Sequence, residues 1–172
     1  METTKNKLSP QLTNFFKKMS DFLNTTIYYY GSIQRLDYFP NQSDIDVAIY
    51  SDNVYSTINM LQAFLHIKKE KINRIVCKIN NNVIYGYKLK YSNKMISDVV
   101  VEIAIYDNKF KNIIQQDFID AILIPTHILV LLYIVKFLHY RIHIIDESSY
   151  VYCKKYIIDK LCLSNKKIFI TY

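Results

Sequence analysis

The sequence predicts an α/β (α+β) fold, with one mixed β-sheet, flanking helices and a C-terminal helical portion. The chain has 172 residues, of which 51% are hydrophobic, and this suits one compact domain with a sizeable core. Early in the chain, apolar residues at helical spacing alternate with short β-branched and aromatic runs. Residues 72–106 are then strand-like, and later segments are helical. This order favours a sheet domain followed by helices.

The first part of the chain begins with a helix. Ser9 followed by Pro10 is a typical helix start, and apolar residues then recur every three to four positions. A short aromatic run reaches Gly31, which is typical of a strand that ends in a turn. The elements expected here are a helix at 10–24, a strand at 27–30, a short helical turn, a loop at Pro40–Asn41, a strand at 44–50 and a helix at 54–69.

The second part begins with a predicted three-stranded meander. Polar breaks at 80–82 and 92–94 divide residues 72–106, and the last strand covers about 95–106. The remaining elements expected are helices at 109–118, 124–141 and 147–163 and an edge strand at 168–170. We expect a sheet core over residues 1–120 and a helical portion over 121–172 that packs on it.

Several classes of protein are excluded by composition. The balance of apolar and charged residues is not that of a disordered or collagen-like chain. The three cysteines, at spacings of neither a zinc site nor a disulfide framework, predict a reducing compartment. The N-terminus does not read as a signal peptide, and the apolar run 121–138 contains Pro125 and Lys136. We therefore expect a cytoplasmic protein with no membrane association.

The net charge of +7 lies entirely beyond residue 60. Such a balance suits a partner rich in phosphate, although lysines scattered over a solvated face give the same total. The heavy use of Lys, Ile, Asn and Tyr is typical of an adenine- and thymine-rich genome, such as that of a large DNA virus, an intracellular parasite or a low-GC bacterium. For a viral protein, the expected location is the host cytoplasm or the virion.

Gly31 and Ser32 lie between a strand and a helix start, in a chain with only 2 glycines. A strand that turns through Gly-Ser into a helix presents backbone N–H groups and a hydroxyl to an anion. The pair therefore indicates a phosphate site. The alternative is a plain tight turn.

Asp44 and Asp46 alternate with apolar residues at strand period, so their side chains share one face of the strand. Two like charges on one face repel unless a cation lies between them, and oxygen ligands suit magnesium or manganese. The alternative is that Asp44 caps the loop and Asp46 faces solvent.

Glu102 lies in the otherwise apolar run 99–105, where a carboxylate is costly to bury without a partner. If its strand lies beside the Asp44–Asp46 strand, Glu102 completes a cluster of three carboxylates able to hold two divalent ions. Asp98 has the same parity and is the rival, but it adjoins the turn at 92–94. Pairing of Glu102 with an edge lysine is the other alternative.

These residues resemble the nucleotidyltransferase fold of the DNA polymerase beta superfamily, and most of all its minimal nucleotidyltransferases. In that pattern a Gly-Ser-x-x-Arg segment leads through a proline-bearing loop into Ser-Asp-x-Asp, here from Gly31 to Arg35 and from Ser43 to Asp46. The resemblance covers about 31–50 and, with the third-acid strand, extends to about 106. The third acid is usually aspartate, and Glu102 departs from that pattern.

The resemblance implies metal-dependent transfer of a nucleoside monophosphate from a nucleoside triphosphate, such as ATP, to an acceptor hydroxyl, with release of pyrophosphate. It implies a catalytic core within 1–120 and two Mg²⁺ or Mn²⁺ ions. The implied catalytic and metal-binding residues are Asp44, Asp46 and Glu102. The implied nucleotide-binding residues are Gly31, Ser32 and Arg35.

Several alternatives stay open at this point. Arg35 can pair with Asp37 instead of a phosphate, and Lys136 either reaches the triphosphate or lies on the wet side of its helix. The acceptor can be nucleic acid, protein or a small molecule, and the oligomeric state is undetermined. The chain can also be an inactive module of this fold that binds nucleotide or nucleic acid, or a regulatory partner that acts through protein contacts.

Overall fold

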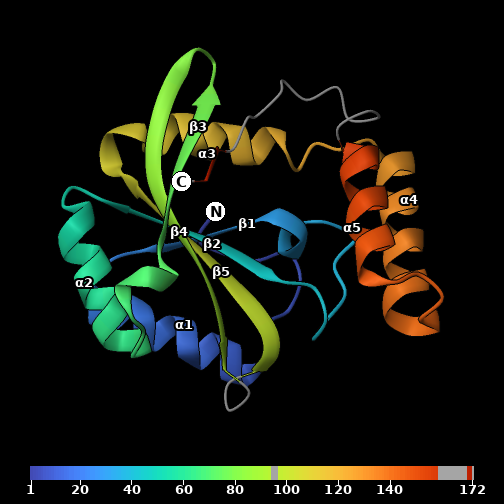
Figure 1. Ribbon diagram of the computed structural model, residues 1–172, viewed down its shortest axis with the longest axis horizontal. Coiled ribbons are helices and arrows are strands. Elements are labelled where there is room, and N and C mark those ends of the chain that lie inside the picture. Colours follow the sequence, from blue (N-terminus) through green and yellow to red (C-terminus); the bar gives the residue numbers. More distant parts are fainter. Residues whose placement is uncertain (94–96, 159–169, 172) are drawn as a thin grey trace.

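A computed structural model shows the expected mixed sheet with helices on both faces (Figure 1), and it describes residues 1–93, 97–158 and 170–171. Among these residues, six strands form one sheet in the order β1-β2-β5-β4-β3-β6. The strands are β1 (Ile27–Tyr30), β2 (Ile45–Ser51), β3 (Asn73–Ile79), β4 (Asn82–Asn93), β5 (Ser97–Asp107) and β6 (Ile170–Thr171). The fold class predicted from the sequence is confirmed.

Five α-helices and four short helical turns are described. The helices are α1 (Pro10–Leu23), α2 (Val54–Leu65), α3 (Lys111–Asp120), α4 (Thr126–Phe137) and α5 (Glu147–Tyr156). The turns are η1 (Gly31–Gln34), η2 (Lys69–Lys71), η3 (Asn108–Phe110) and the π-helical η4 (Leu138–Ile142). None of the helices in the described ranges is long and apolar enough to cross a bilayer.

Local sequence explains where α1 begins and ends. The Ser9 hydroxyl accepts a hydrogen bond from the Leu12 N–H at 3.3 Å, and Pro10 occupies the first turn, where its missing N–H costs nothing. Asn24 ends the helix with φ of 47°, in the left-handed conformation that asparagine tolerates. The helix therefore matches the predicted 10–24 almost residue for residue.

The parallel pairing of β2 with β5 decides the centre of the sheet. The other neighbouring strands pair antiparallel, and β5 reaches β2 only after α2 and the β3–β4 hairpin. In this register Asp46 lies directly beside Glu102, and Ala48 beside Ala104. Two segments far apart in the chain are thus side by side, with their side chains on the same face.

The two faces of the sheet are covered by different helices. Helices α1 and α2 pack on the face that carries Val47 and Ile103. Helix α3 packs on the opposite face, which carries Ala48 and Ala104 and therefore also Asp46 and Glu102. Helices α4 and α5 lie side by side at one end of the sheet (Figure 1) and share their own apolar cluster, which includes Leu132 and Tyr150.

Several predicted helix boundaries differ from the structure. The helix predicted at 109–118 is the turn η3 followed by α3, which ends at Asp120. The helix predicted at 54–69 ends at Leu65, because His66 adopts a left-handed conformation with φ of 52° and its N–H caps the Gln62 carbonyl. The helix predicted at 124–141 becomes α4 followed by the π-helical turn η4. In the described part of the helix predicted at 147–163, α5 ends at Tyr156 and residues 157–158 continue it with π-helical geometry.

Some expectations fall outside the described residues. These are the end of the predicted helix 147–163, from residue 159, and residues 168–169 of the predicted edge strand. Strand β6 nevertheless pairs with β3 through Ile170 and Thr171, so an edge strand is present next to the predicted position.

Candidate active site

The candidate site centres on two carboxylates from neighbouring parallel strands. Asp46 in β2 and Glu102 in β5 are register partners on the face that α3 covers. Asp44 lies just before β2 and is exposed, whereas Asp46 is partly buried. Of the alternative that Asp44 caps the loop and Asp46 faces solvent, the structure shares only the place of Asp44 at the end of the loop, because Asp46 lies on a covered part of the sheet.

Gly31 packs directly against the Asp46 carboxylate. Its φ of +72° is a conformation that side chains disfavour, and a Cβ built on it would lie 2.0 Å from Oδ2 of Asp46. Only glycine combines this backbone turn with this close approach. Gly31 opens the turn η1, and the next residue, Ser32, is buried. The structure thus brings the Gly-Ser turn against the second aspartate of the Asp-x-Asp pair.

The N-terminal segment holds this turn from behind. The side-chain amide of Asn6 donates to the backbone carbonyls of Ile33 at 2.9 Å and Arg35 at 2.7 Å. The side chain of Gln34 donates to the Thr3 carbonyl at 2.6 Å and accepts from the Lys5 N–H at 2.9 Å. These bonds link two distant parts of the chain, so η1 has a fixed position beside the carboxylates.

Burial and neighbouring charges alter the ionisation of the two aspartates. Burial, followed by the like charge of Glu102, raises the pKa of Asp46 to about 7. Lys154 and Lys88 oppose this shift, and Asp44 adds to it. Partial burial also raises the pKa of Asp44, against the opposing charges of Lys90 and Lys154. A cation bound between Asp44, Asp46 and Glu102 would therefore be stabilised.

Glu102 has an ion-pair partner in the neighbouring strand. The Nζ of Lys88 in β4 lies 2.6 Å from Oε1 of Glu102, and the two side chains are 32% and 13% exposed. The lysine pairing considered for Glu102 is therefore present, but in the middle of the sheet and beside Asp46 rather than at an edge. The side chain of the rival acid, Asp98, lies outside the described residues.

The donor set suits a divalent ion, with one qualification of geometry. Asp46 and Glu102 supply oxygen ligands side by side, and their mutual repulsion is what a cation would relieve. Within the described ranges, however, no three Asp, Glu, His or Cys side chains gather as a ready metal cluster. The three predicted ligands, Asp44, Asp46 and Glu102, thus lie near one another but are not close enough together to form a metal cluster.

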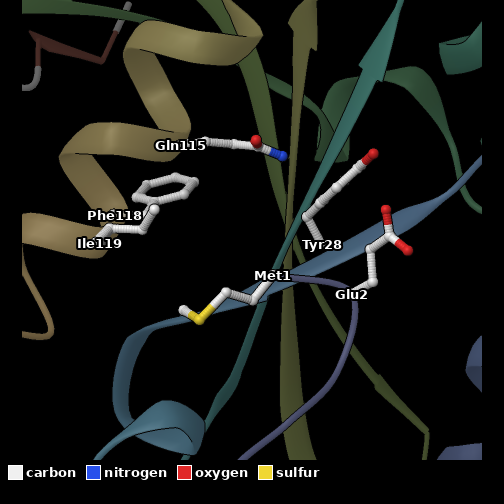
Figure 2. Close-up of a pocket in the computed structure, with 6 residues that line it drawn as sticks. All are labelled: Met1, Glu2, Tyr28, Gln115, Phe118 and Ile119. Atoms are coloured by element: carbon white, nitrogen blue, oxygen red, sulfur yellow. The ribbon is translucent and has the colours of Figure 1, made fainter.

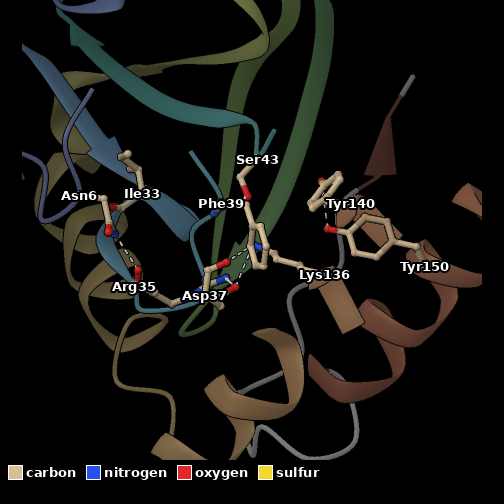
Figure 3. A network of polar contacts seen from close by, with 9 residues as sticks. All are labelled: Asn6, Ile33, Arg35, Asp37, Phe39, Ser43, Lys136, Tyr140 and Tyr150. Atoms are coloured by element: carbon tan, nitrogen blue, oxygen red, sulfur yellow. Dashed lines mark hydrogen bonds and ion pairs between the residues drawn. The ribbon is translucent and has the colours of Figure 1, made fainter. Parts of the chain in front are cut away.

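Arg35 does not lie against the carboxylate pair. Its guanidinium binds Asp37 through two hydrogen bonds, of 2.7 Å and 3.0 Å, so the Asp37 pairing considered for Arg35 is the one observed (Figure 3). Lys136 of α4 adds a third contact, 3.0 Å from Oδ2 of the same carboxylate, the oxygen that Nη2 of Arg35 also binds. It also donates to the Asp37 carbonyl at 2.7 Å.

The alternative that Lys136 lies on the wet side of its helix was wrong. The side chain is 2% exposed and its ammonium binds Asp37. Burial lowers the pKa of Lys136 to about 8, although the Asp37 charge opposes the shift. Burial favours protonation of Asp37, yet Arg35 and Lys136 outweigh it and lower the Asp37 pKa. This buried network joins the loop after the Gly-Ser turn to the C-terminal helices.

Helix α5 faces the aspartates from the C-terminal portion. Lys154 acts electrostatically on both Asp44 and Asp46, and Glu147 acts on Asp44. The side chain of Gln42 donates to the Tyr140 carbonyl at 3.3 Å, so the loop before Asp44 also contacts η4. The C-terminal helices therefore form one wall of the candidate site.

Sequence reasoning missed three lysines at the site. Lys88 and Lys90 occupy alternate positions of β4, and Lys90 is the register partner of Glu102. Their parity was a usable signal, given the predicted meander. Lys154 had no comparable signal, because its position depends on how the C-terminal helices dock.

A separate pocket of about 220 Å³ lies between β1 and α3 (Figure 2). Its lining residues are Met1, Glu2, Tyr28, Gln115, Phe118 and Ile119. Phe118 also stacks on Tyr30, with ring centroids 4.0 Å apart, and Tyr30 is the other register partner of Asp46. The aromatic stack thus stands between this pocket and the carboxylates.

Comparison with known families agrees with this geometry. Residues 10–147 match the nucleotidyltransferase domain family. This stretch runs from α1 to the start of α5 and includes the Gly31–Ser32 turn, both aspartates and Glu102. No curated protein matches the chain.

Proposed function

Since the chain belongs to the nucleotidyltransferase domain family, within the polymerase beta-like superfamily, we propose that it transfers a nucleoside monophosphate from a nucleoside triphosphate to an acceptor hydroxyl and releases pyrophosphate. The observation that carries the proposal is the packing of Gly31 against Asp46, which itself lies beside Glu102. A phosphate-binding turn and a pair of metal-binding carboxylates are then within one site.

Asp44, Asp46 and Glu102 are assigned as the ligands of divalent magnesium or manganese. When bound, such ions neutralise charge on the triphosphate and favour loss of the proton of the acceptor hydroxyl. The N–H groups of the η1 turn and the Ser32 hydroxyl bind the terminal phosphates, because they are donors fixed at the start of a helical turn. Lys154 adds positive charge from α5.

Arg35 has a different assignment in this proposal. Its guanidinium is committed to Asp37, so it holds the loop that connects Ser32 to Ser43 rather than a phosphate. Residues 1–120 then form the catalytic core, and residues 121–172 contribute the Asp37 contact of Lys136 and the wall with Lys154.

The test is incubation with each labelled nucleoside triphosphate and magnesium or manganese, with RNA, DNA, protein and small hydroxyl compounds as separate acceptors. The control is the double variant Asp44→Asn/Asp46→Asn, which keeps side-chain volume and removes both charges. Label transfer that the control lacks supports the proposal and identifies the acceptor class. Equal labelling by both proteins, or none by either, contradicts it.

A second function has one specific observation in its favour. The Lys88–Glu102 ion pair neutralises the third carboxylate without a metal, as an inactive nucleotide-binding module requires. Such a module binds nucleotide equally well with and without a chelator. The enzyme instead loses nucleotide affinity when divalent ions are removed, since the triphosphate then meets unscreened carboxylates.

A further inference from the structure

The Lys88–Glu102 ion pair lies where the proposed function needs a metal ligand to be available. Lys88 is opposite Ala104 in the register, and its side chain reaches diagonally to Glu102, while Lys90 is directly opposite Glu102. Among the described ion pairs, the partner of Glu102 is nevertheless Lys88. Its charge also acts on Asp46. Lys88 therefore forms an ion pair with Glu102 and also acts electrostatically on Asp46.

From this contact, and resting on the proposed function, we infer that the Lys88 ammonium is the internal counter-cation of Glu102, which a divalent ion displaces and which then binds a phosphate of the nucleotide. Lys88 is thus assigned as a nucleotide-binding residue whose partner changes when the site is loaded. The inference also explains why the carboxylates are adjacent without forming a closed metal cluster.

Charge balance supports the exchange of partners. Three carboxylates, Asp44, Asp46 and Glu102, are accompanied by three lysines that touch them or act on them electrostatically, Lys88, Lys90 and Lys154. Glu147 also acts on Asp44, so without bound ions the site lies within about one charge of neutral. Divalent ions and a triphosphate enter with nearly cancelling charges, so a lysine displaced from a carboxylate finds its new partner among the phosphate oxygens.

The chemistry and exposure of Lys88 also allow its ion pair with Glu102 to break. Lysine is a point charge on a flexible stem, whereas arginine forms a rigid bidentate contact with a carboxylate. The Lys88 side chain is 32% exposed, so its ammonium can leave Glu102 without crossing a packed core. The buried Asp37 network, in which Lys136 is 2% exposed, has no such freedom.

The experiment measures Mn²⁺ affinity without nucleotide, by the electron paramagnetic resonance signal of free Mn²⁺, in wild type and three variants. Lys88→Met removes the competing charge and is expected to tighten Mn²⁺ binding by about tenfold. Lys90→Met is the matched control, since it removes a charge from the same strand and face; less than about threefold is expected. Lys88→Arg is expected to weaken Mn²⁺ binding, because arginine holds Glu102 more firmly.

A second measurement tests whether Lys88 binds a phosphate of the nucleotide when the metal is present. With saturating Mg²⁺, a non-hydrolysable ATP analogue is expected to bind Lys88→Met about tenfold more weakly than wild type. Circular dichroism confirms that each variant is folded, and the Lys88→Arg result stands by itself if Lys88→Met does not fold.

The outcomes separate the inference from the proposed function. Equal Mn²⁺ affinities of Lys88→Met and Lys90→Met, with Mn²⁺ still bound by wild type, overturn the role of Lys88 and leave the metal-dependent enzyme intact. Nucleotide binding without Mn²⁺ binding in any of the proteins overturns both, and favours the inactive module.

Discussion

The carboxylate of Asp46 occupies the space that a side chain on Gly31 would fill. A Cβ on Gly31 would lie 2.0 Å from Oδ2 of Asp46, well inside van der Waals contact. The two residues come from the end of β1 and from β2, which pair antiparallel. The glycine therefore does more than turn the chain, since it also sets the position of the carboxylate that lies beside Glu102.

Gly31→Ala is expected to displace Asp46 and to abolish detectable Mn²⁺ binding. The left-handed backbone and the clash together cost about 1–3 kcal/mol of folding stability. The matched control is Gly86→Ala, at the only other glycine, where a Cβ would meet the Tyr106 ring at 2.6 Å. That variant is expected to lose stability but keep Mn²⁺ binding. Mn²⁺ affinity in Gly31→Ala equal to that of wild type contradicts the assignment.

Asp46→Asn is expected to stabilise the metal-free protein more at high pH than at low pH. The pKa of Asp46 is raised from 3.8 to about 7, so the folded state holds this proton more tightly than the unfolded state. Folding stability therefore falls as pH rises between these values, and the full penalty is present above about pH 7. The variant lacks this penalty and gains about 3–4 kcal/mol over wild type at about pH 8 and about 1–2 kcal/mol at about pH 5.

Urea unfolding in the presence of a chelator measures both differences. A gain of the same size at the two pH values shows that Asp46 is not held under charge repulsion. The same change at an exposed carboxylate, Asp52→Asn, is the control for the substitution itself.

Lys154→Met is expected to weaken nucleotide binding about threefold to tenfold, and the loss shrinks as salt is added. The physical reason is that Lys154 acts on both aspartates of the site from α5. Lys155→Met is the control one residue away, since Lys155 is exposed on the same helix. Titration with a fluorescent ATP analogue measures both variants, and equal effects exclude a specific role for Lys154.

Asp37→Asn is expected to lower folding stability by about 3–5 kcal/mol, because it leaves two buried cations, Arg35 and Lys136, without their carboxylate. Adding Lys136→Met restores part of this loss, so the two changes are not additive. Chemical denaturation of the single and double variants measures the coupling. Asp107→Asn breaks an exposed pair with Lys109 and leaves stability almost unchanged. Additive losses at Asp37 and Lys136 contradict a shared network.

Much of the fold was predictable because the decisive signals are local. The Ser9–Pro10 start and the Asp-x-Asp alternation report helix and strand from a few neighbouring residues, and α1 and β2 lie where expected. The helix boundary at Leu65 was missed because a left-handed His66 is less typical of a helix end than glycine.

The candidate site divides in the same way. The sequence by itself determined the residues with chemistry, since a glycine in a glycine-poor chain and a glutamate in an apolar run are recognisable without any neighbour. Only the tertiary structure decided their partners: Gly31 with Asp46, Glu102 with Lys88, and Lys136 with Asp37. Strand order and helix docking bring these residues together across long separations in the chain. Periodicity records which face a residue occupies, but it contains no information about which strand or helix lies opposite.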